Sequence, residues 1–441
     1  MKSVDIVYFV EHIARELDVA CAVEAILEMN SDISVKIASI THGFEDVLDG
    51  YQPRVVALPY CVAVHEAGLD KLVARWPQAQ YINLSYEQVL GRAQKNLNSP
   101  KDAFAREYVM HHAWGDFFAQ YLQANGVPEA HIMVNGNPSY ALYREPYKAY
   151  YGNQRHELAQ QFGLDPEKRW VFIPENYGWA FFRDHMVRAR IRRGFDPEHA
   201  YQYRDFARQS LHAATQWWRD AAQIDSVELI IRPRPAIPAE SFVETVREMA
   251  GDVPEQLHFI KHGTVREWIL ASDVIISNFS TTLLEAAVAQ KPVYMLVPYA
   301  FPDFLYAEWY ELTDKIDTGD AFADVITQPA LPENWKKLEG WAVNAMISRG
   351  DAISGLADIL ASLVRGELSV PPPLEIARQH ERFSLDRIIR LARKHGWKLM
   401  QNSLAALGIK TQDQGWAAHE SDQVTAEVVV GRVARWKEIL S

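Results

Sequence analysis

Three consecutive hydroxyl side chains, Ser280–Thr282, form the clearest chemical pattern in this sequence. They lie between an apolar run, Val274–Ile276, and a stretch rich in helix-forming residues, Leu283–Gln290. This order predicts a strand, a turn and a helix. Free backbone N–H groups and the dipole at the start of such a helix attract anions, so the hydroxyls are candidates for binding a phosphate group.

A second interpretation of the same residues needs no ligand. Thr282 and Glu285 have the T-x-x-E spacing of a capping box, in which two side chains satisfy backbone N–H groups at the start of a helix. These residues alone leave both interpretations open.

Further polar side chains follow predicted strands in the second half of the chain: Glu175, Arg232, Arg234, Lys261, His262, Ser277 and Asn278. Because the carboxyl ends of parallel strands meet at one edge of a sheet, we expect these side chains to lie close together. A carboxylate, guanidinium groups and a hydroxyl-bearing helix start suit an anionic, phosphate-bearing substrate. Each residue alone also has an ordinary structural interpretation: Glu175 as a helix cap, Arg232 as part of a surface ion pair and His262 as a turn residue.

Two candidates in the first third of the chain could face the same ligand from the other side. His42 follows the predicted strand Val35–Ile40, and Glu87 follows Tyr81–Leu84. Alternatively, Glu87 lies in the first turn of a helix and complements its dipole.

Alternating strand-like and helix-like segments position these residues. The strands are expected at Asp5–Val10, Val35–Ile40, Val55–Ala57, Tyr81–Leu84, Ile132–Val134, Trp170–Ile173, Val227–Ile231, His258–Ile260, Val274–Ile276 and Val293–Val297. A long helix is expected over Asp102–Asn125. This rhythm predicts an α/β protein with two Rossmann-like domains, 1–150 and 151–330, and a ligand cleft between them. A helical extension, 331–441, follows, and its next strand-like run is "EVVVGRVARW".

Composition and charge exclude several classes of protein. The net charge of −12 argues against a nucleic-acid binder. The chain has only two cysteines, its N-terminus lacks a signal-peptide pattern, and it has no run of about 20 apolar residues. These features favour a cytoplasmic protein. The basic amphipathic segment Arg382–Met400 could lie on the inner face of the cytoplasmic membrane or pack on its own protein.

The usual cofactor and hydrolase motifs do not occur. The sequence has no GxGxxG after a strand, no GxxxxGK[ST], no GxSxG and no HExxH. No DxD-like pair stands at a predicted strand end. We therefore expect an enzyme that needs neither a cofactor nor a metal.

The segment "REWILASDVIISNFSTTLLEAAVAQKPVYML" resembles the nucleotide-binding half of GT-B glycosyltransferases and CDP-glycerol glycerophosphotransferases. "RPRP" stands where many members have Arg-Pro-His-Pro or Lys-x-His-Pro. "NLSYEQ" and "GNPSY" are similar to bacterial surface-carbohydrate biosynthesis proteins, including the retaining β-Kdo transferases of capsule and O-antigen assembly. The resemblance covers about residues 1–330 and implies the GT-B architecture.

The resemblance also implies roles for the candidate residues. Ser280, Thr281 and Thr282 would hold the donor phosphate, and Glu285 would lie near the ribose. Arg232 would replace the first basic residue of the family motif, and Arg234 stands where its histidine is expected. Glu175 would be the nucleophile of a retaining mechanism, although the family carboxylate is Asp, and Glu87 or His42 would be the acid or base.

The expected function is therefore transfer of a sugar, with Kdo from CMP-Kdo as the expected donor and with retention, to a glycan or glycolipid acceptor of capsule or O-antigen. One alternative is a polyol-phosphate transferase of the CDP-glycerol or CDP-ribitol type, which needs a histidine base. Others are a non-catalytic sugar-binding subunit and a UDP-sugar epimerase. The helical tail could dock on a membrane surface or on partner polymerase modules.

Overall fold

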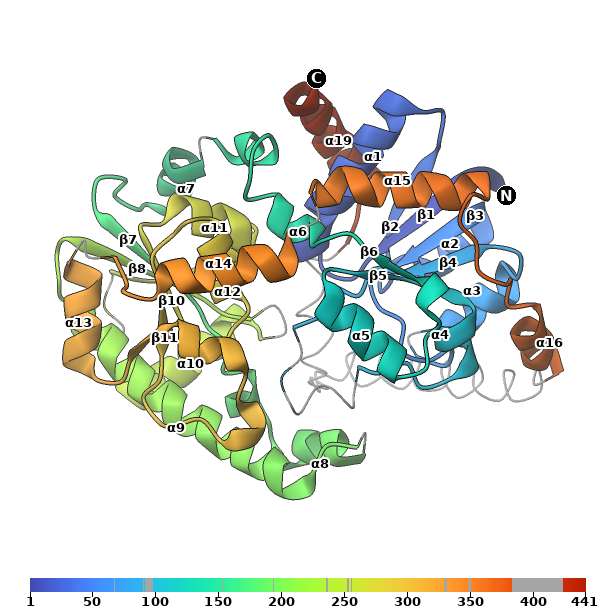
Figure 1. Cartoon of the computed structure of the whole chain (residues 1–441). Coiled ribbons are helices and arrows are strands. Elements are labelled where there is room, and N and C mark those ends of the chain that lie inside the picture. The colour runs from blue at the N-terminus through green and yellow to red at the C-terminus, as the bar shows by residue number, and fades with distance from the viewer. Residues whose placement is uncertain are drawn as a thin grey trace, which may run out of the picture.

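A computed structural model describes residues 1–66, 68–89, 91, 98–152, 154–192, 194–234, 237–251, 254, 256–328, 331–347, 350–382 and 423–441. The described residues form two six-stranded parallel sheets, one in each half of the chain, with helices packed against them (Figure 1). This is the predicted architecture of two Rossmann-like halves. The amphipathic segment was predicted from the basic residues Arg387 to Lys398. These residues lie outside the part of the chain that the structure describes.

The first sheet has the strand order β2-β1-β3-β4-β5-β6. Its strands are β1 Lys2–Val10, β2 Val35–Ser39, β3 Tyr51–Leu58, β4 Gln80–Asn83, β5 Val109–Ala113 and β6 Ile132–Val134. The second sheet has the order β12-β11-β10-β7-β8-β9. Its strands are β7 Arg169–Pro174, β8 Val227–Arg232, β9 Leu257–Phe259, β10 Val274–Ser277, β11 Val293–Leu296 and β12 Asp314–Ile316.

Helices connect the strands and cover both sheets. In the first half they are α1 Asp18–Asn30, α2 Phe44–Gly50, α3 Leu69–Arg75, α4 Ala103–Glu107, α5 Asp116–Ala124 and α6 Pro138–Ala141. In the second half they are α7 Gln154–Phe162, α8 Asp184–Arg192, α9 Pro197–Ala221, α10 Ala239–Ala250, α11 Val265–Ala271, α12 Thr282–Val288 and α13 Gly319–Thr327. Toward the C-terminus follow α14 Trp335–Met346, α15 Ala352–Arg365, α16 Leu374–Arg382 and α19 Ala426–Leu440.

Each sheet has a point at which the strand order reverses. In the first sheet, β1 lies between β2 and β3, and in the second sheet β7 lies between β8 and β10. In open parallel sheets, ligands bind outside the carboxyl ends of the strands at such a point. A ligand is therefore expected next to the residues after Val10 in β1, Pro174 in β7 and Ser277 in β10.

The helix predicted over Asp102–Asn125 is wrong. The structure has a short helix, the buried strand β5 and a second helix in this range. His111 and His112 of β5 are polar, so the strand lacks the continuous apolar run expected of a central parallel strand. Both side chains are nevertheless buried, and they bond to the carbonyl of Ala105 and to Asn135 respectively.

The segment after residue 330 packs on both halves. α14 contacts α12 of the second half, whereas α15 and α19 contact α1 of the first half (Figure 1). The strand-like run "EVVVGRVARW" is in fact the helix α19, because Val429, Val433 and Trp436 recur at helical spacing and are buried. No helix in the described part of the chain is long and apolar enough to cross a membrane.

Candidate functional site

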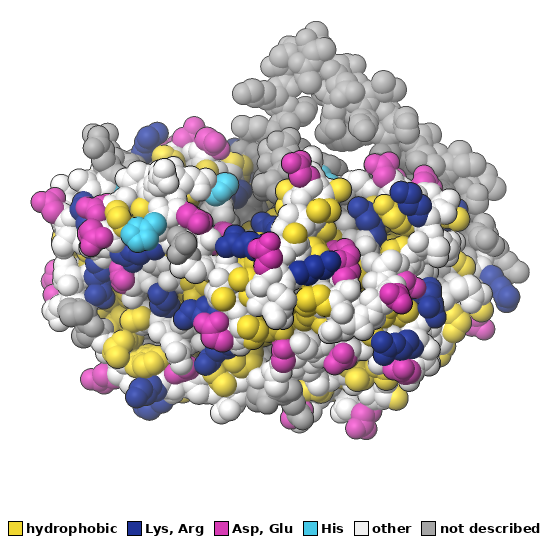
Figure 2. Space-filling view, turned by 90° about the horizontal axis from the view of Figure 1, so that it is seen from above, with side chains coloured by type: hydrophobic (Ala, Val, Ile, Leu, Met, Phe, Trp, Pro, Cys, Tyr) yellow, Lys and Arg dark blue, Asp and Glu magenta, His cyan; other side chains and the backbone are white. Residues whose placement is uncertain are grey.

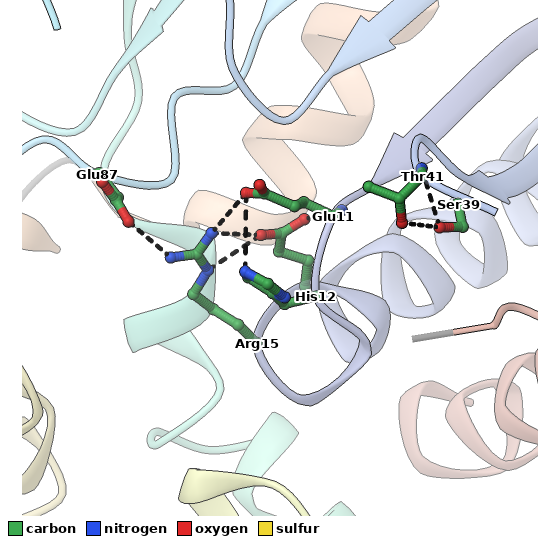
Figure 3. A network of polar contacts seen from close by, with 7 residues as sticks. Glu11, His12, Arg15, Ser39, Thr41 and Glu87 are labelled. Atoms are coloured by element: carbon green, nitrogen blue, oxygen red, sulfur yellow. Dashed lines mark hydrogen bonds and ion pairs between the residues drawn. The ribbon is translucent and has the colours of Figure 1, made fainter. Parts of the chain in front are cut away.

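A network of charged side chains follows β1, at the reversal point of the first sheet (Figure 3). The guanidinium of Arg15 donates to Glu16 at 2.7 Å, to Glu87 at 3.2 Å and to Glu11 at 3.5 Å. Glu16 is buried and also accepts the backbone N–H of Glu11 at 2.6 Å. His12 lies beside Glu11, with 3.9 Å between Nε2 and the carboxylate. The network thus places an imidazole and carboxylates where a ligand is expected.

Local backbone structure presents these residues. β1 ends at Val10, His12 is extended, and Ile13–Leu17 form a π-helical turn that continues into α1. Single π turns occur frequently at functional sites. Burial raises the pKa of Glu11 above its ordinary value, and His12 and Arg15 oppose this shift. An imidazole beside a carboxylate is a pair of groups that general acid–base catalysis uses.

Glu87 and His42, the two candidates predicted in the first half of the chain, lie beyond the ends of different strands. Glu87 belongs to the network through Arg15, with its side chain 70% exposed. His42 lies after β2, where its backbone N–H donates to Ser39 Oγ at 3.2 Å. A hollow of about 290 Å³, lined among others by Thr41 and Phe44, lies at this end of β2.

At the reversal point of the second sheet, hydrogen bonds join the turns after β7 and β10. The backbone N–H of Asn176 donates to Asn278 Oδ1 at 2.9 Å, and Asn176 Nδ2 donates to the carbonyl of Phe279 at 3.3 Å. Ser277 Oγ donates to the carbonyl of Pro174. Asn278 is 2% exposed, and among the described residues its Nδ2 has no hydrogen-bond acceptor. An unpaired buried donor of this kind is costly unless a ligand or water accepts from it.

The hydroxyl turn lies at the start of α12, as predicted. Ser280 Oγ accepts the backbone N–H of Thr282 at 3.2 Å and donates to Thr282 Oγ1 at 3.0 Å, whereas Thr281 is exposed. The capping box of Thr282 and Glu285 is wrong. Glu285 instead accepts a hydrogen bond of 2.8 Å from the hydroxyl of Tyr143, which belongs to the first half of the chain.

Glu175 lies directly after β7, as predicted, but its carboxylate is turned inward. The residue is 4% exposed, and its two oxygens accept the backbone N–H groups of Tyr177 at 2.6 Å and of Arg234 at 2.7 Å. Burial raises its pKa, and the two backbone N–H groups oppose the shift. This geometry is that of a side chain that holds two loops, not of one presented to a sugar.

Arg232 and Lys261 hold loops as well. The buried guanidinium of Arg232 donates to the carbonyls of His262 at 2.8 Å and Gly263 at 2.7 Å, and burial lowers its pKa to about 10. Lys261 Nζ donates to the carbonyl of Ile237 at 3.1 Å. Neither cation is presented to a donor phosphate in this structure.

Arg234 and His262 are the exposed members of this set. Among the described residues the guanidinium of Arg234 has no hydrogen bond, and it lies against Gly178, where a Cβ atom would come within 3.0 Å of Nη1. The ring of His262 packs 5.7 Å from that of Phe162. Arg234 is therefore the cation of the predicted set that remains open to an anion.

Contacts between the halves lie beside the hydroxyl turn. Tyr140 donates to the carbonyl of Thr281 at 3.3 Å, and Tyr143 donates to Glu285. Burial raises the pKa of Glu285, while the charge of Arg266 and the hydrogen bond from Tyr143 oppose the shift. Two tyrosines of the first half thus contact α12 and the residue before it.

The sequence-based prediction missed Glu11, His12, Arg15 and Glu16. A signal was present, because "EHIARE" directly follows the predicted strand Asp5–Val10. Ligands of parallel sheets bind after the carboxyl ends of strands, and this segment stands directly after such an end. Among the described residues no group of three or more His, Cys, Asp or Glu could hold a metal ion, and metal independence stays a prediction.

Comparison with known proteins supports the fold. No family model and no curated protein matches the chain. The wall teichoic acid polymerase TagF is similar with a TM-score of 0.54 and 10% identity over 83% of this chain and 90% of that one. The UDP-GlcNAc 2-epimerase of Neisseria meningitidis, bound to UDP-GlcNAc, has a TM-score of 0.52 and 12% identity over 82% and 100%. The S. aureus MnaA–UDP structure has a TM-score of 0.50 and 14% identity over 83% and 97%.

These likenesses confirm the predicted GT-B-like fold, which nucleotide-sugar-dependent enzymes share. At such low identity they show the fold alone. None of them is specific to Kdo transferases.

Proposed function

We propose that the chain is a transferase of cell-surface polymer synthesis that uses a nucleotide-activated donor. The donor binds after β7 and β10, and the acceptor is activated after β1. The observation that carries this proposal is the complementary chemistry of the two reversal points. One offers hydrogen-bond donors and an exposed guanidinium, and the other offers an imidazole among carboxylates.

The second half supplies the groups that suit a leaving nucleotide. Asn278 Nδ2 is an unpaired buried donor, Thr281 carries an exposed hydroxyl, and Arg234 is an exposed cation. Donors fixed before the reaction stabilise the negative charge that develops on a departing phosphate. The hydroxyl turn and Arg234 therefore keep the donor-binding role expected from the sequence.

The first half supplies the base. His12, oriented beside Glu11, would take the proton of an acceptor hydroxyl. As the acceptor oxygen forms its new bond to the transferred group, the bond to the nucleotide breaks, and the nucleotide leaves with the electron pair. Arg15 would fix Glu11 and Glu16 during this step.

Among donors, a CDP-activated polyol is favoured over CMP-Kdo. Retention by two displacements needs a carboxylate that is open to the anomeric carbon, and both oxygens of Glu175 are engaged by backbone N–H groups. A polyol-phosphate transferase needs a histidine base, and His12 fills this role although "RPRP" lacks the histidine of the family motif. The TagF structures of the same fold include one with CDPG.

Calorimetric titration with CMP, CDP and UDP tests the donor site. We expect CDP to bind most tightly and Ser280→Ala/Thr281→Ala to weaken it about tenfold or more, since hydrogen bonds to charged groups are lost. Ser241→Ala/Thr245→Ala on α10 is the matched control and should change the affinity less than twofold, with thermal unfolding showing that both variants fold. Preference for CMP would favour the Kdo transferase, preference for UDP would favour an epimerase, and no nucleotide binding would exclude the donor site.

A further inference from the structure

The helix α8 and the residue before it carry a local excess of positive charge that the candidate site does not use. The segment contains one acid, Asp184, and four exposed arginines, Arg183, Arg188, Arg190 and Arg192. Asp184 does not neutralise them, because it binds Arg204 of α9 at 2.6 Å. In a chain of net charge −12, this concentration of opposite sign is unusual.

Most of these arginines are unpaired. Among the described residues, the guanidinium groups of Arg183, Arg188 and Arg192 have no hydrogen bond or ion pair. Arg190 lies over the ring of Phe182, 5.7 Å from its centroid. The segment therefore offers guanidinium groups that can still bind an anion.

Helical geometry places the charges on the outer face. Val187 is buried and Ile191 is half-buried, and they pack toward α9 at i and i+4. Arg188 and Arg192 have the same spacing on the exposed side, and His185 precedes Arg188 by three residues. Like charges at i and i+4 repel each other, so a bound anion would relieve the repulsion.

The helix also has a fixed place relative to the donor site. A short turn connects Glu175, at the end of β7, to α8. Arg208 of α9 holds this turn by donating to the carbonyls of Ala180 and Phe182, both at 3.0 Å. Figure 1 shows α8 beyond the start of α9, below the boundary between the two halves.

We propose that α8 is a docking surface for a polyanionic acceptor, a growing polymer that carries phosphate groups at intervals. This inference rests on the proposed function and adds the chemical class of the acceptor. Guanidinium groups bind phosphate oxygens in a bidentate manner and bind them more specifically than lysine does. Several such contacts along one chain would hold the acceptor while its end is extended.

A polymer suits this surface better than a lipid membrane. An interfacial helix turns an apolar face toward the lipid, whereas the apolar residues Val187 and Ile191 of α8 face the protein and only Met186 is an exposed large apolar residue of this helix. On the face that Figure 2 shows, basic and acidic side chains are interspersed.

Binding of a synthetic glycerol phosphate oligomer to the full chain tests this inference. Fluorescence anisotropy would compare the wild type with Arg188→Glu/Arg192→Glu and with the control Arg247→Glu/Lys336→Glu, which changes the charge equally at exposed positions elsewhere. We expect the α8 variant to bind at least about tenfold more weakly, the control to change less than about threefold, and added salt to weaken wild-type binding. CDP affinity should be the same in all three proteins.

Each other outcome has a defined meaning. If the α8 variant and the control bind the oligomer equally well, the inference is overturned. It is also overturned if the wild type binds phosphatidylglycerol vesicles or single-stranded DNA more tightly than it binds the oligomer. Loss of oligomer binding with CDP binding retained in the wild type and the variant supports the inference. If no protein binds a nucleotide, the proposed function fails, whereas binding of the oligomer through α8 would still support the docking surface.

Discussion

At the scale of single residues, the structure separates side chains that hold the site from side chains that are presented to a ligand. As expected, Glu175 follows the strand β7 and Arg232 stands at the end of β8, but the side chains of both are hydrogen-bonded to the backbone of neighbouring loops. Their positions were predictable from the sequence because a strand end is a local feature. The direction of each side chain was not, because it depends on loops distant in the sequence.

Glu175→Gln tests this distinction. An amide keeps one acceptor and turns an NH₂ group toward a backbone N–H, so we expect a loss of about 1–3 kcal/mol of unfolding free energy. Urea unfolding measures it, with Glu129→Gln, an exposed carboxylate, as the control. Unchanged stability together with loss of transfer activity would instead make Glu175 the nucleophile.

At the scale of secondary-structure elements, tertiary packing overrides local preference in two places. The valines of α19 favour a strand, but the helix forms because one face of it packs on α1. In β5 the two histidines make the sequence too polar to be recognised as an interior strand. They are tolerated in the core because His111 is hydrogen-bonded to the carbonyl of Ala105 and His112 to Asn135. Neither partner can be recognised from the local sequence, so these elements were predicted wrongly while the strongly apolar strands were predicted correctly.

The helix α1 carries a titrating group. Glu24 is buried on α1, and burial together with the nearby Glu28 raises its pKa to about 7, with Lys36 and Lys437 opposing the shift. The unfolded chain loses this proton at its ordinary pKa, 4.5, before the folded chain does. The contribution of Glu24 to stability is therefore present below about pH 4.5 and is lost as the pH rises to about 7.

The free energy of unfolding of Glu24→Gln should therefore increase relative to that of the wild type as the pH rises. We expect the two proteins to be similar at about pH 4.5 and the variant to be more stable by up to about 3 kcal/mol above pH 7. Urea unfolding from pH 4.5 to 8 measures the difference, in which the contributions of other groups cancel. A difference that does not depend on pH would contradict the raised pKa.

At the scale of the whole molecule, one buried cluster joins the two halves and the C-terminal helix. Asp18 of α1 accepts from Tyr151 at 2.7 Å, from Arg266 of α11 at 3.1 Å and from Arg432 of α19. The residues come from opposite ends of the chain, so no pattern in the sequence could reveal them. Because a buried ion left without its partner is costly, this cluster fixes how the halves sit together.

The two halves also meet at α12, where Tyr143 of the first half donates to Glu285 of the second at 2.8 Å. In the proposed function, transfer needs both halves, because the proposed donor groups belong to the second half and His12 belongs to the first. The interpretation of the molecule as a transferase therefore depends on His12 acting on an acceptor while the nucleotide is held across from it.

Phosphorus NMR of CDP-glycerol turnover tests this central proposal most directly. The wild type, His12→Asn and the exposed control His156→Asn would be incubated with CDP-glycerol, with and without a glycerol phosphate oligomer. We predict that CMP forms only with the oligomer present, and that His12→Asn slows its formation about 100-fold or more, while its CDP affinity and the control stay unchanged. CMP formation without an acceptor, or an undiminished rate in His12→Asn, would contradict it.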